Sequence, residues 1–236
     1  GLEEVIVSTP LSKLQGDNIV NIEHRKIKDL NLTSNTNISE AISNISGVDQ
    51  NSTGVGIGKP VIRGLSGNRI VTYSQGMRIE NQQWGSEHDL GESGLGIEGV
   101  EVIKGPASLL YGADALGGVL FFIDERYTEH NTFESYFESK FLSNTLGTQN
   151  NLGLKYHKGN IKLNVFGNYS SNANYQIPDK QRVVNTMFDT KNFKTSLGLD
   201  FKNLITNIRY GYLENDFGIA ETIDYTTSTN RTTAEP

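Results

Sequence analysis

The feature that most constrains this chain is a strict alternation of side-chain types that begins at Phe133. Between 133 and 141 the odd positions are Phe, Ser, Phe, Ser and Phe, and the even positions are Glu, Tyr, Glu and Lys. Four further segments alternate in a similar way: 152–157, 161–169, 193–201 and 204–212. Successive side chains of a β-strand point to opposite faces. The pattern therefore predicts five consecutive two-faced strands, close to the roughly 9–11 residues that cross an outer membrane at a tilt.

The connections between these segments alternate between short and long. Lys158–Asn160 and Lys202–Asn203 are tight turns, whereas 172–190 is a polar loop and 217–236 a polar tail. This is typical of a transmembrane β-barrel with one plain and one elaborated rim. A soluble antiparallel sandwich also alternates and is the competing interpretation. Aromatic residues near the strand ends favour the barrel, since membrane interfaces are lined by such girdles: Phe133, Phe141, Tyr156, Tyr169, Phe193, Phe201 and Tyr212.

Composition excludes several classes of protein. Hydrophobic residues make up 36% of the chain, and no run approaches the ~18 apolar residues of a membrane helix. A barrel strand is only half apolar, so this composition is compatible with a barrel. The net charge of −6 argues against nucleic acid as the main partner, and the absence of cysteine excludes disulfides and thiolate metal sites.

Residues 1 to about 125 follow a different pattern, with short helices and short strands. Ile38, Ala41, Ile42 and Ile45 have helical spacing. Thr36 or Asn37 can cap the start of that helix, and Gly47 stands where a left-handed residue ends one. A second short helix is predicted from Pro106 to Gly112.

Strand-like runs complete this first half. They lie at Val61–Arg63, Arg69–Tyr73, Val100–Lys104 and Val119–Ile123, and Gly76 is predicted to form a hairpin turn. The predicted fold is a small α+β domain with a mixed sheet and short helices, followed by antiparallel transmembrane β-barrel strands that form an incomplete barrel.

Three stretches of the first half resemble the plug domain of TonB-dependent outer-membrane receptors. The first is Ile38–Val48 (ISEAISNISGV), in which Ser46 replaces the family's usual proline. The second runs from Val61 (VIRGL) through Asn68–Val71 (NRIV) to GMR at 76–78, without the usual Asp-Gly turn. The third and most specific is Ile97–Gly112 (IEGVEVIKGPASLLYG), followed by GGV at 117–119. The three blocks occur in family order and precede barrel-like strands.

The resemblance implies three parts of the chain. Residues 1–10 would be a TonB-box-like segment, residues 11–125 the plug, and residues 126–236 about the first five barrel strands. Five strands cannot close around a domain, because plugged transporters use about 22. The chain is therefore expected to be a fragment of a longer receptor.

Near the start, Glu3, Glu4, Val5, Ile6 and Val7 resemble a TonB box, the extended segment that a periplasmic coupling protein grips. The mechanism would be strand addition, in which exposed backbone groups pair with the edge of a partner's sheet. The alternative is an ordinary first strand of the plug.

Arg63 and Lys104 occupy plug-motif positions where the family places basic residues that face barrel carboxylates. The resemblance implies that they hold the plug within a polar lumen. The alternative for each is a solvated surface charge.

One segment of the first half suggests a ligand. It contains Gln82, Gln83 and Trp84, followed by Glu87, His88 and Asp89. Trp84 is the only tryptophan and can stack on a ring or sugar, while the other three offer ligands for zinc or a similar cation. The alternative is a solvated polar loop.

The resemblance implies energised uptake of a scarce solute across the outer membrane of a Gram-negative bacterium. The expected solutes are a ferric siderophore, haem, a metal ion or a similar compound, and the expected partners are TonB and outer-membrane lipid. A passive porin or adhesin-type barrel with an N-terminal domain is the alternative. No enzyme activity and no cofactor is expected, although a metal ion could be cargo. The Gly54–Lys59 segment lacks Walker spacing, and no Gly-x-Ser-x-Gly motif is present.

Overall fold

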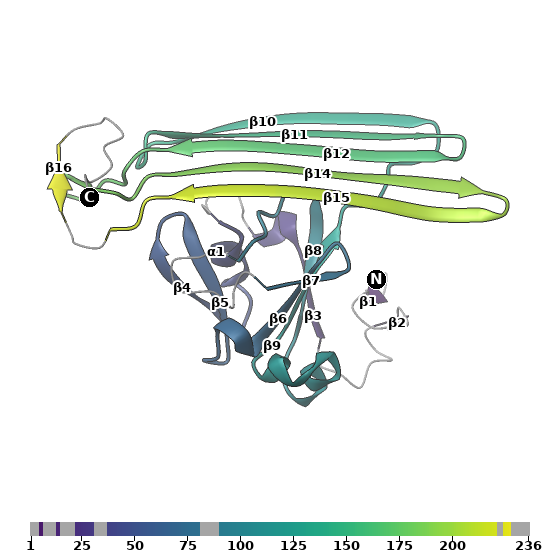
Figure 1. Cartoon of the computed structure of the whole chain (residues 1–236), viewed down its shortest axis with the longest axis horizontal. Coiled ribbons are helices and arrows are strands. Elements are labelled where there is room, and N and C mark those ends of the chain that lie inside the picture. The colour runs from purple at the N-terminus through teal and green to yellow at the C-terminus, as the bar shows by residue number, and fades with distance from the viewer. Residues whose placement is uncertain are drawn as a thin grey trace. The chain divides into compact units, whose positions relative to one another are not determined.

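The structure, a computed structural model of the chain, describes residues 5–6, 13–14, 22–30, 37–80, 90–220 and 224–227. Its internal contacts divide the chain into two units. The first comprises residues 1–53 and 57–125, and the second comprises residues 54–56 and 126–236. Figure 1 shows the five long strands of the second unit and the shorter elements of the first.

A five-stranded mixed sheet is the centre of the first unit. Its strands, in spatial order, are β3 (Ile22–Lys26), β8 (Ile97–Ile103), β9 (Gly118–Asp124), β6 (Ile70–Ser74) and β7 (Met77–Ile79). Neighbours are antiparallel except β6 and β9, which are parallel. Two further pairs of strands accompany this sheet: β1 (Val5–Ile6) with β2 (Lys13–Leu14), and β4 (Val48–Gly54) with β5 (Ile57–Ile62).

Helix α1 (Ile38–Ile42) forms where the helical spacing predicts it. The Asn37 side chain accepts a hydrogen bond from the backbone N–H of Glu40 at 2.8 Å, which satisfies one free donor of the first turn. Gly47 follows with φ 72°, a left-handed conformation that favours glycine. The N-cap prediction is confirmed at Asn37. The predicted helix end at Gly47 is wrong, because α1 ends at Ile42 with Ser43 as its C-cap in a right-handed conformation, and Gly47 lies in the turn before β4.

The remaining helices are short 3₁₀ segments. They are η2 (Ile27–Leu30), η3 (Gly67–Arg69), η5 (Pro106–Tyr111) and η6 (Ala113–Leu116). The second predicted helix is therefore present at η5, with the tighter geometry. Ser108, which is buried, donates its hydroxyl to the carbonyls of Gly105 and Ala115 and so links η5 to η6.

The predicted strands are confirmed, and the turn at Gly76 joins β6 to β7. Gln75 and Gly76 have φ of 53° and 76°, so two successive left-handed residues make the tight reversal typical of a hairpin. The sequence did not indicate β3 or β4, because neither alternates clearly. The sheet separates two apolar clusters, one that includes α1 and Phe122 and another that includes Ile22 and Val119.

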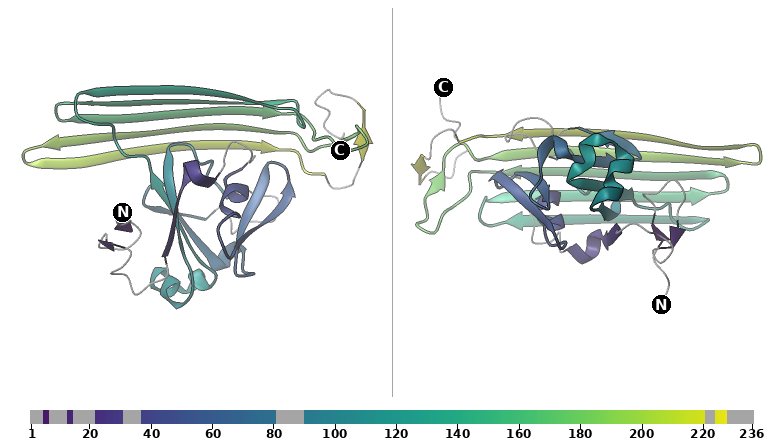
Figure 2. Two further views of the ribbon diagram at one scale, coloured as in Figure 1. Left: turned by 180° about the vertical axis from the view of Figure 1, so that it is seen from behind. Right: turned by 90° about the horizontal axis from the view of Figure 1, so that it is seen from below.

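The second unit is one antiparallel sheet in chain order. Its strands are β10 (Thr132–Leu142), β11 (Gly147–Lys158), β12 (Ile161–Asn172), β14 (Phe188–Phe201) and β15 (Leu204–Phe217). All five predicted strands are confirmed, and each is longer than its alternating segment. Figure 2 shows the same five-stranded layer from behind and from below. Among the described residues, no helix is long and apolar enough to cross a membrane.

Register places most of the apolar residues of the five strands on one face, called here the apolar face. One row of directly paired residues consists of Phe133, Tyr156, Leu163, Leu197 and Ile208. A second row consists of Phe137, Leu152, Gly167, Phe193 and Tyr212. Most of the large side chains in these rows are exposed, as the outward face of a barrel requires.

The opposite face, called here the polar face, carries a hydrogen-bonded ladder of polar side chains. The amide of Asn151 donates to Glu138 at 3.0 Å, and the amide of Asn168 donates to Asn151 at 2.6 Å. Tyr136 also lies on this face, where its ring covers Gly153, so a side chain at position 153 would require the ring to move.

The connection between β12 and β14 is more ordered than the polar loop predicted for 172–190. Both strands extend into it, and β13 (Arg182–Val183) pairs with β16 (Tyr225–Thr226). The Asn174 side chain accepts hydrogen bonds from the backbone of Thr186 and Met187, at 2.8 and 3.0 Å. The predicted polar loop is thus present between the two strands, and buried polar side chains such as Asn174 fold it on itself.

Candidate functional site

The TonB-box candidate is described only at its centre. Val5 and Ile6 form β1, with Val5 opposite Leu14 and Ile6 opposite Lys13. Their backbone is extended, as strand addition requires. Glu3, Glu4 and Val7 lie outside the described residues.

The ligand-binding candidates all lie outside the described residues: Gln82, Gln83, Trp84, Glu87, His88 and Asp89. The residues on either side of this segment are described, and they are firmly held. The contacts of these flanking residues hold the two ends of the segment on the first unit.

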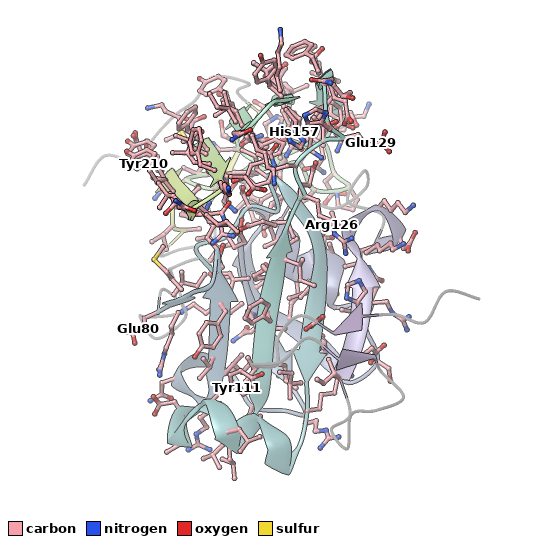
Figure 3. The ribbon with its side chains drawn as sticks, turned by 90° about the vertical axis from the view of Figure 1, so that its right-hand side faces the viewer. Glu80, Tyr111, Arg126, Glu129, His157 and Tyr210 are labelled. Atoms are coloured by element: carbon pink, nitrogen blue, oxygen red, sulfur yellow. The ribbon has the colours of Figure 1, made fainter. Side chains whose placement is uncertain are left out.

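On the N-terminal side, Arg78 of β7 is the anchor. Its guanidinium donates to Asp114 at 2.8 Å and lies 3.3 Å from Glu80. The hydrogen bond to Asp114 raises the pKa of Arg78 above its ordinary value. Figure 3 labels Glu80 at this end of the hairpin.

On the C-terminal side, Leu90 and Glu92 are the anchors. Leu90 is fully buried in the larger apolar cluster. The Glu92 carboxylate, 2% exposed, accepts hydrogen bonds from the Ser74 hydroxyl and from the backbone of Ser93 and Gly94. These bonds compensate for burying the charge. Both ends of the candidate segment are therefore fixed to the sheet.

Among the residues that the structure describes, no group of three or more His, Cys, Asp or Glu side chains could hold a metal ion. Glu87, His88 and Asp89 are not among those residues, so the metal hypothesis for them stays a prediction.

The two basic candidates from the plug motifs have contacts within the first unit. Lys104 donates to Glu23 at 2.8 Å and to the carbonyl of Ser46, and its side chain is 9% exposed. Arg63 is exposed and has φ 51°, and its guanidinium lies next to Gly105. Lys104, which directly follows β8, thus connects that strand to β3 and to the turn between α1 and β4, a role that the motif did not indicate.

A buried contact between two titratable side chains of the sheet was missed in the sequence. His24 of β3 lies opposite Glu101 of β8, with 3.5 Å between Nδ1 and Oε1, and the Glu101 side chain has no exposed surface. The same row of the sheet continues through Phe121, Tyr73 and Arg78. The only sequence signal was a charged residue inside a run of apolar ones at 100–103.

A second feature without a sequence signal is the segment 126–130, which we call the strap. It runs along the polar face of the second unit and contacts all five strands there. Figure 3 labels Arg126, Glu129 and His157 in this region.

A family model identifies much of the first unit. Residues 17–119 match the TonB-dependent receptor plug domain. The match includes the main sheet except the last residues of β9, and it ends seven residues before the strap.

Solved structures extend the likeness into the second unit. The siderophore receptor PirA from Acinetobacter baumannii matches 84% of this chain at 20% identity, with a TM-score of 0.61. The copper transporter OprC matches 92% at 18% identity (TM-score 0.67), and the ferric enterobactin receptor PfeA from Pseudomonas aeruginosa, as a double mutant, matches 82% at 17% (TM-score 0.65). In each comparison the chain spans 32% of the other protein. Residues 17–119 therefore match the TonB-dependent receptor plug domain, and the fold of the chain, strands of the second unit included, is shared with part of these two receptors and this transporter.

Proposed function

We propose that the protein to which this chain belongs takes up a scarce solute across the outer membrane by a TonB-dependent, energised mechanism. The observation that carries the proposal is a plug domain followed directly by five in-register strands with one exposed apolar face and one polar face. The apolar face fits outer-membrane lipid, and the polar face fits a lumen that surrounds the plug.

The proposed partner of the N-terminal segment is TonB. Residues 3–7 would add as a strand to the edge of a TonB sheet, and force applied there would open a path past the plug. The extended backbone of Val5 and Ile6 supports this arrangement.

The proposed solute is a ferric siderophore, haem, a metal ion or a similar compound. Of the similar structures, one is described as a siderophore receptor, one as a ferric enterobactin receptor and one as a copper transporter. Trp84 with Glu87, His88 and Asp89 would contact the solute, from a segment that Arg78 and Glu92 hold at its ends. No cofactor is proposed, so a bound metal ion would be cargo.

The experiment is deletion of residues 3–7 from the full-length receptor. Uptake of the solute by cells is expected to be lost, while its binding to the cell surface is retained. A passive porin or adhesin, the competing function, predicts that uptake is the same with and without these residues.

A further inference from the structure

Two histidines of the second unit meet at one end of the strand sheet, on its polar face. We infer that His130 and His157 form a two-imidazole site for a borderline divalent cation such as Zn²⁺ or Cu²⁺. The inference goes beyond the proposed uptake and does not rest on it, because it concerns an ion that the strand sheet itself would bind. It is also separate from the candidate segment 81–89.

His157 is the fixed member of the pair. It lies near the end of β11, directly opposite Thr132 of β10. Its Nδ1 is 3.0 Å from the carbonyl oxygen of Thr128. A carbonyl oxygen can only accept, so Nδ1 carries the proton and the neutral ring keeps its lone pair on Nε2. Histidines that bind metals almost always donate their other N–H in this way.

A tight turn places His130 beside His157. The N–H of Thr132 donates to the carbonyl of Glu129 at 3.2 Å, and Asn131 has φ 62°, a conformation that asparagine tolerates. His130 is the second residue of this turn, and it is exposed. Within the described part of the chain, no hydrogen bond involves the nitrogens of its ring. Both of these nitrogens are therefore available to a ligand.

The distance between the two rings agrees with binding to one ion. Their centroids are 5.1 Å apart, and their planes are 89° apart. With a metal–nitrogen distance of about 2.0 Å, each ring centre lies about 3.2 Å from the ion, and a tetrahedral angle then separates the two centres by about 5.2 Å. The two backbones already stand at the separation that such a site requires.

The charges around the pair do not oppose a cation. Of the two residues directly opposite His157, Thr132 is uncharged, and the ammonium of Lys162 is 3.3 Å from the carboxylate of Asp200. Glu129, which is exposed, adds a negative charge next to His130 in the chain. Figure 3 labels His157 and Glu129 at this end of the sheet.

The site would be an open one with two protein ligands. Among the residues that the structure describes, no third His, Cys, Asp or Glu side chain completes a metal-binding group. Water would fill the remaining positions, so the ion could exchange. Imidazole nitrogen suits Zn²⁺, Cu²⁺ and Ni²⁺, whereas Mg²⁺ and Ca²⁺ prefer oxygen.

The position of the pair indicates where the ion would come from. β11 ends at Lys158, and the left-handed Gly159 turns the chain into β12. Short turns lie on the periplasmic side of outer-membrane barrels. The site would therefore exchange its ion with the periplasm.

Two substitutions of His130 separate ion binding from ring packing. His130→Phe keeps an aromatic ring beside His157 but removes the nitrogen ligand, whereas His130→Cys removes the ring and supplies a thiolate ligand. Zn²⁺ binding to the full-length receptor would be measured by titration calorimetry. His130→Phe is expected to weaken one Zn²⁺ site by at least about 10–100-fold, the loss that follows even from removing a residue that only supports a ligand. His130→Cys should retain that site.

The same proteins loaded with Cu²⁺ give a spectroscopic readout. Electron paramagnetic resonance should show coupling to one nitrogen nucleus fewer in His130→Phe than in the wild type. Equal Zn²⁺ affinity and identical Cu²⁺ spectra for these two proteins would overturn the inference, because the rings would then only pack edge-on.

His88→Ala is the control for the other candidate ligand segment. It should leave the Zn²⁺ site of His130 and His157 unchanged. Loss of the same Zn²⁺ site in His88→Ala would assign the ion to segment 81–89 and overturn the inference.

A further measurement needs no substitution. An ion that joins His130 to β11 should slow local opening of the chain around it. In the wild-type full-length receptor, Zn²⁺ should therefore slow hydrogen exchange in residues 126–134, and Mg²⁺ at the same concentration should not. Equal exchange with the two ions would contradict the inference. None of these results depends on residues 3–7, so normal uptake after deletion of those residues would overturn the proposed function alone.

Discussion

Single glycines show how closely the backbone of the plug is packed. Gly118 has φ 150°, and a Cβ there would lie 2.7 Å from the carbonyl oxygen of Ile103. Gly117 is also tight, with a Cβ position 2.9 Å from the carbonyl of Arg69. The adjacent glycines of the plug motif thus allow β9 to approach its neighbours, which no other residue would permit.

We expect Gly118→Ala to destabilise the plug by about 2–4 kcal/mol, through backbone strain and the clash with Ile103. Gly54→Ala is the matched control, because nothing lies within 4 Å of its Cβ position. That control should change stability by less than about 0.5 kcal/mol. The measurement is the urea concentration at which protease begins to cut the plug of the full-length receptor. Equal effects at the two positions would contradict the packing argument.

A prediction at the same scale concerns the solute. If residues 81–89 contribute a cation site, His88→Ala should weaken binding of a zinc-like ion by about tenfold or more. Affinity should also fall below about pH 6, because a protonated imidazole cannot ligate a metal. For a siderophore or haem, Trp84→Ala should weaken binding more than His88→Ala does, through lost stacking. Titration calorimetry of the full-length receptor separates the cases, and no change in either variant would exclude this segment from the site.

At the scale of elements, the two faces of the strand sheet require side chains of opposite polarity. Leu163 lies between Tyr156 and Leu197 on the apolar face. Its neighbour Asn164 is on the polar face, but it is buried and donates to the strap. Position 164 is therefore a poor site for a mild substitution, and Ser196, which lies opposite Asn164 on β14, is a better one.

We expect Leu163→Arg to cost roughly 2–4 kcal/mol near the middle of the membrane, since a charge would face lipid. The matched change Ser196→Arg, on the polar face, should cost clearly less. The difference would be measured as folding yield and urea midpoint of the full-length receptor in lipid vesicles. Similar losses on both faces would instead indicate a sheet that is buried on two sides.

At the scale of the whole molecule, the position of the TonB-box candidate matters more than its side chains. Strand addition uses backbone N–H and C=O groups, and the N–H of Ile6 is one of the available donors.

We expect Ile6→Pro to abolish uptake by the full-length receptor without lowering its affinity for the solute. Proline removes one donor and disfavours the paired strand conformation. Ile6→Val, which keeps the donor and the extended backbone, is the control and should support normal uptake. Uptake by intact cells and binding to isolated membranes are the two measurements. Normal uptake by the proline variant would remove residues 3–7 from the coupling mechanism.

The sequence by itself determined the local structure of this protein. Alternation in residues 133–212 specifies two-faced strands, because side-chain direction is intrinsic to an extended backbone. Asn37 likewise specifies a helix cap, and Gly47 and Gly76 specify turns, through their own conformational preferences. The candidate solute-binding residues within 81–89 were also proposed from residue types, and the TonB-box candidate from a resemblance in sequence.

Only the tertiary structure decided which distant segments meet. Lys104 donates a hydrogen bond to Glu23, which lies 81 positions earlier in the sequence. Strand β3 pairs with the sheet although most of its residues are polar. The strap crosses five strands because Gly198 leaves room for the Tyr127 ring. Periodicity acts over a few neighbouring residues, whereas these contacts depend on which sheet edges and surfaces are free once the chain has folded. For that reason the attachments of the plug could not be predicted from the sequence.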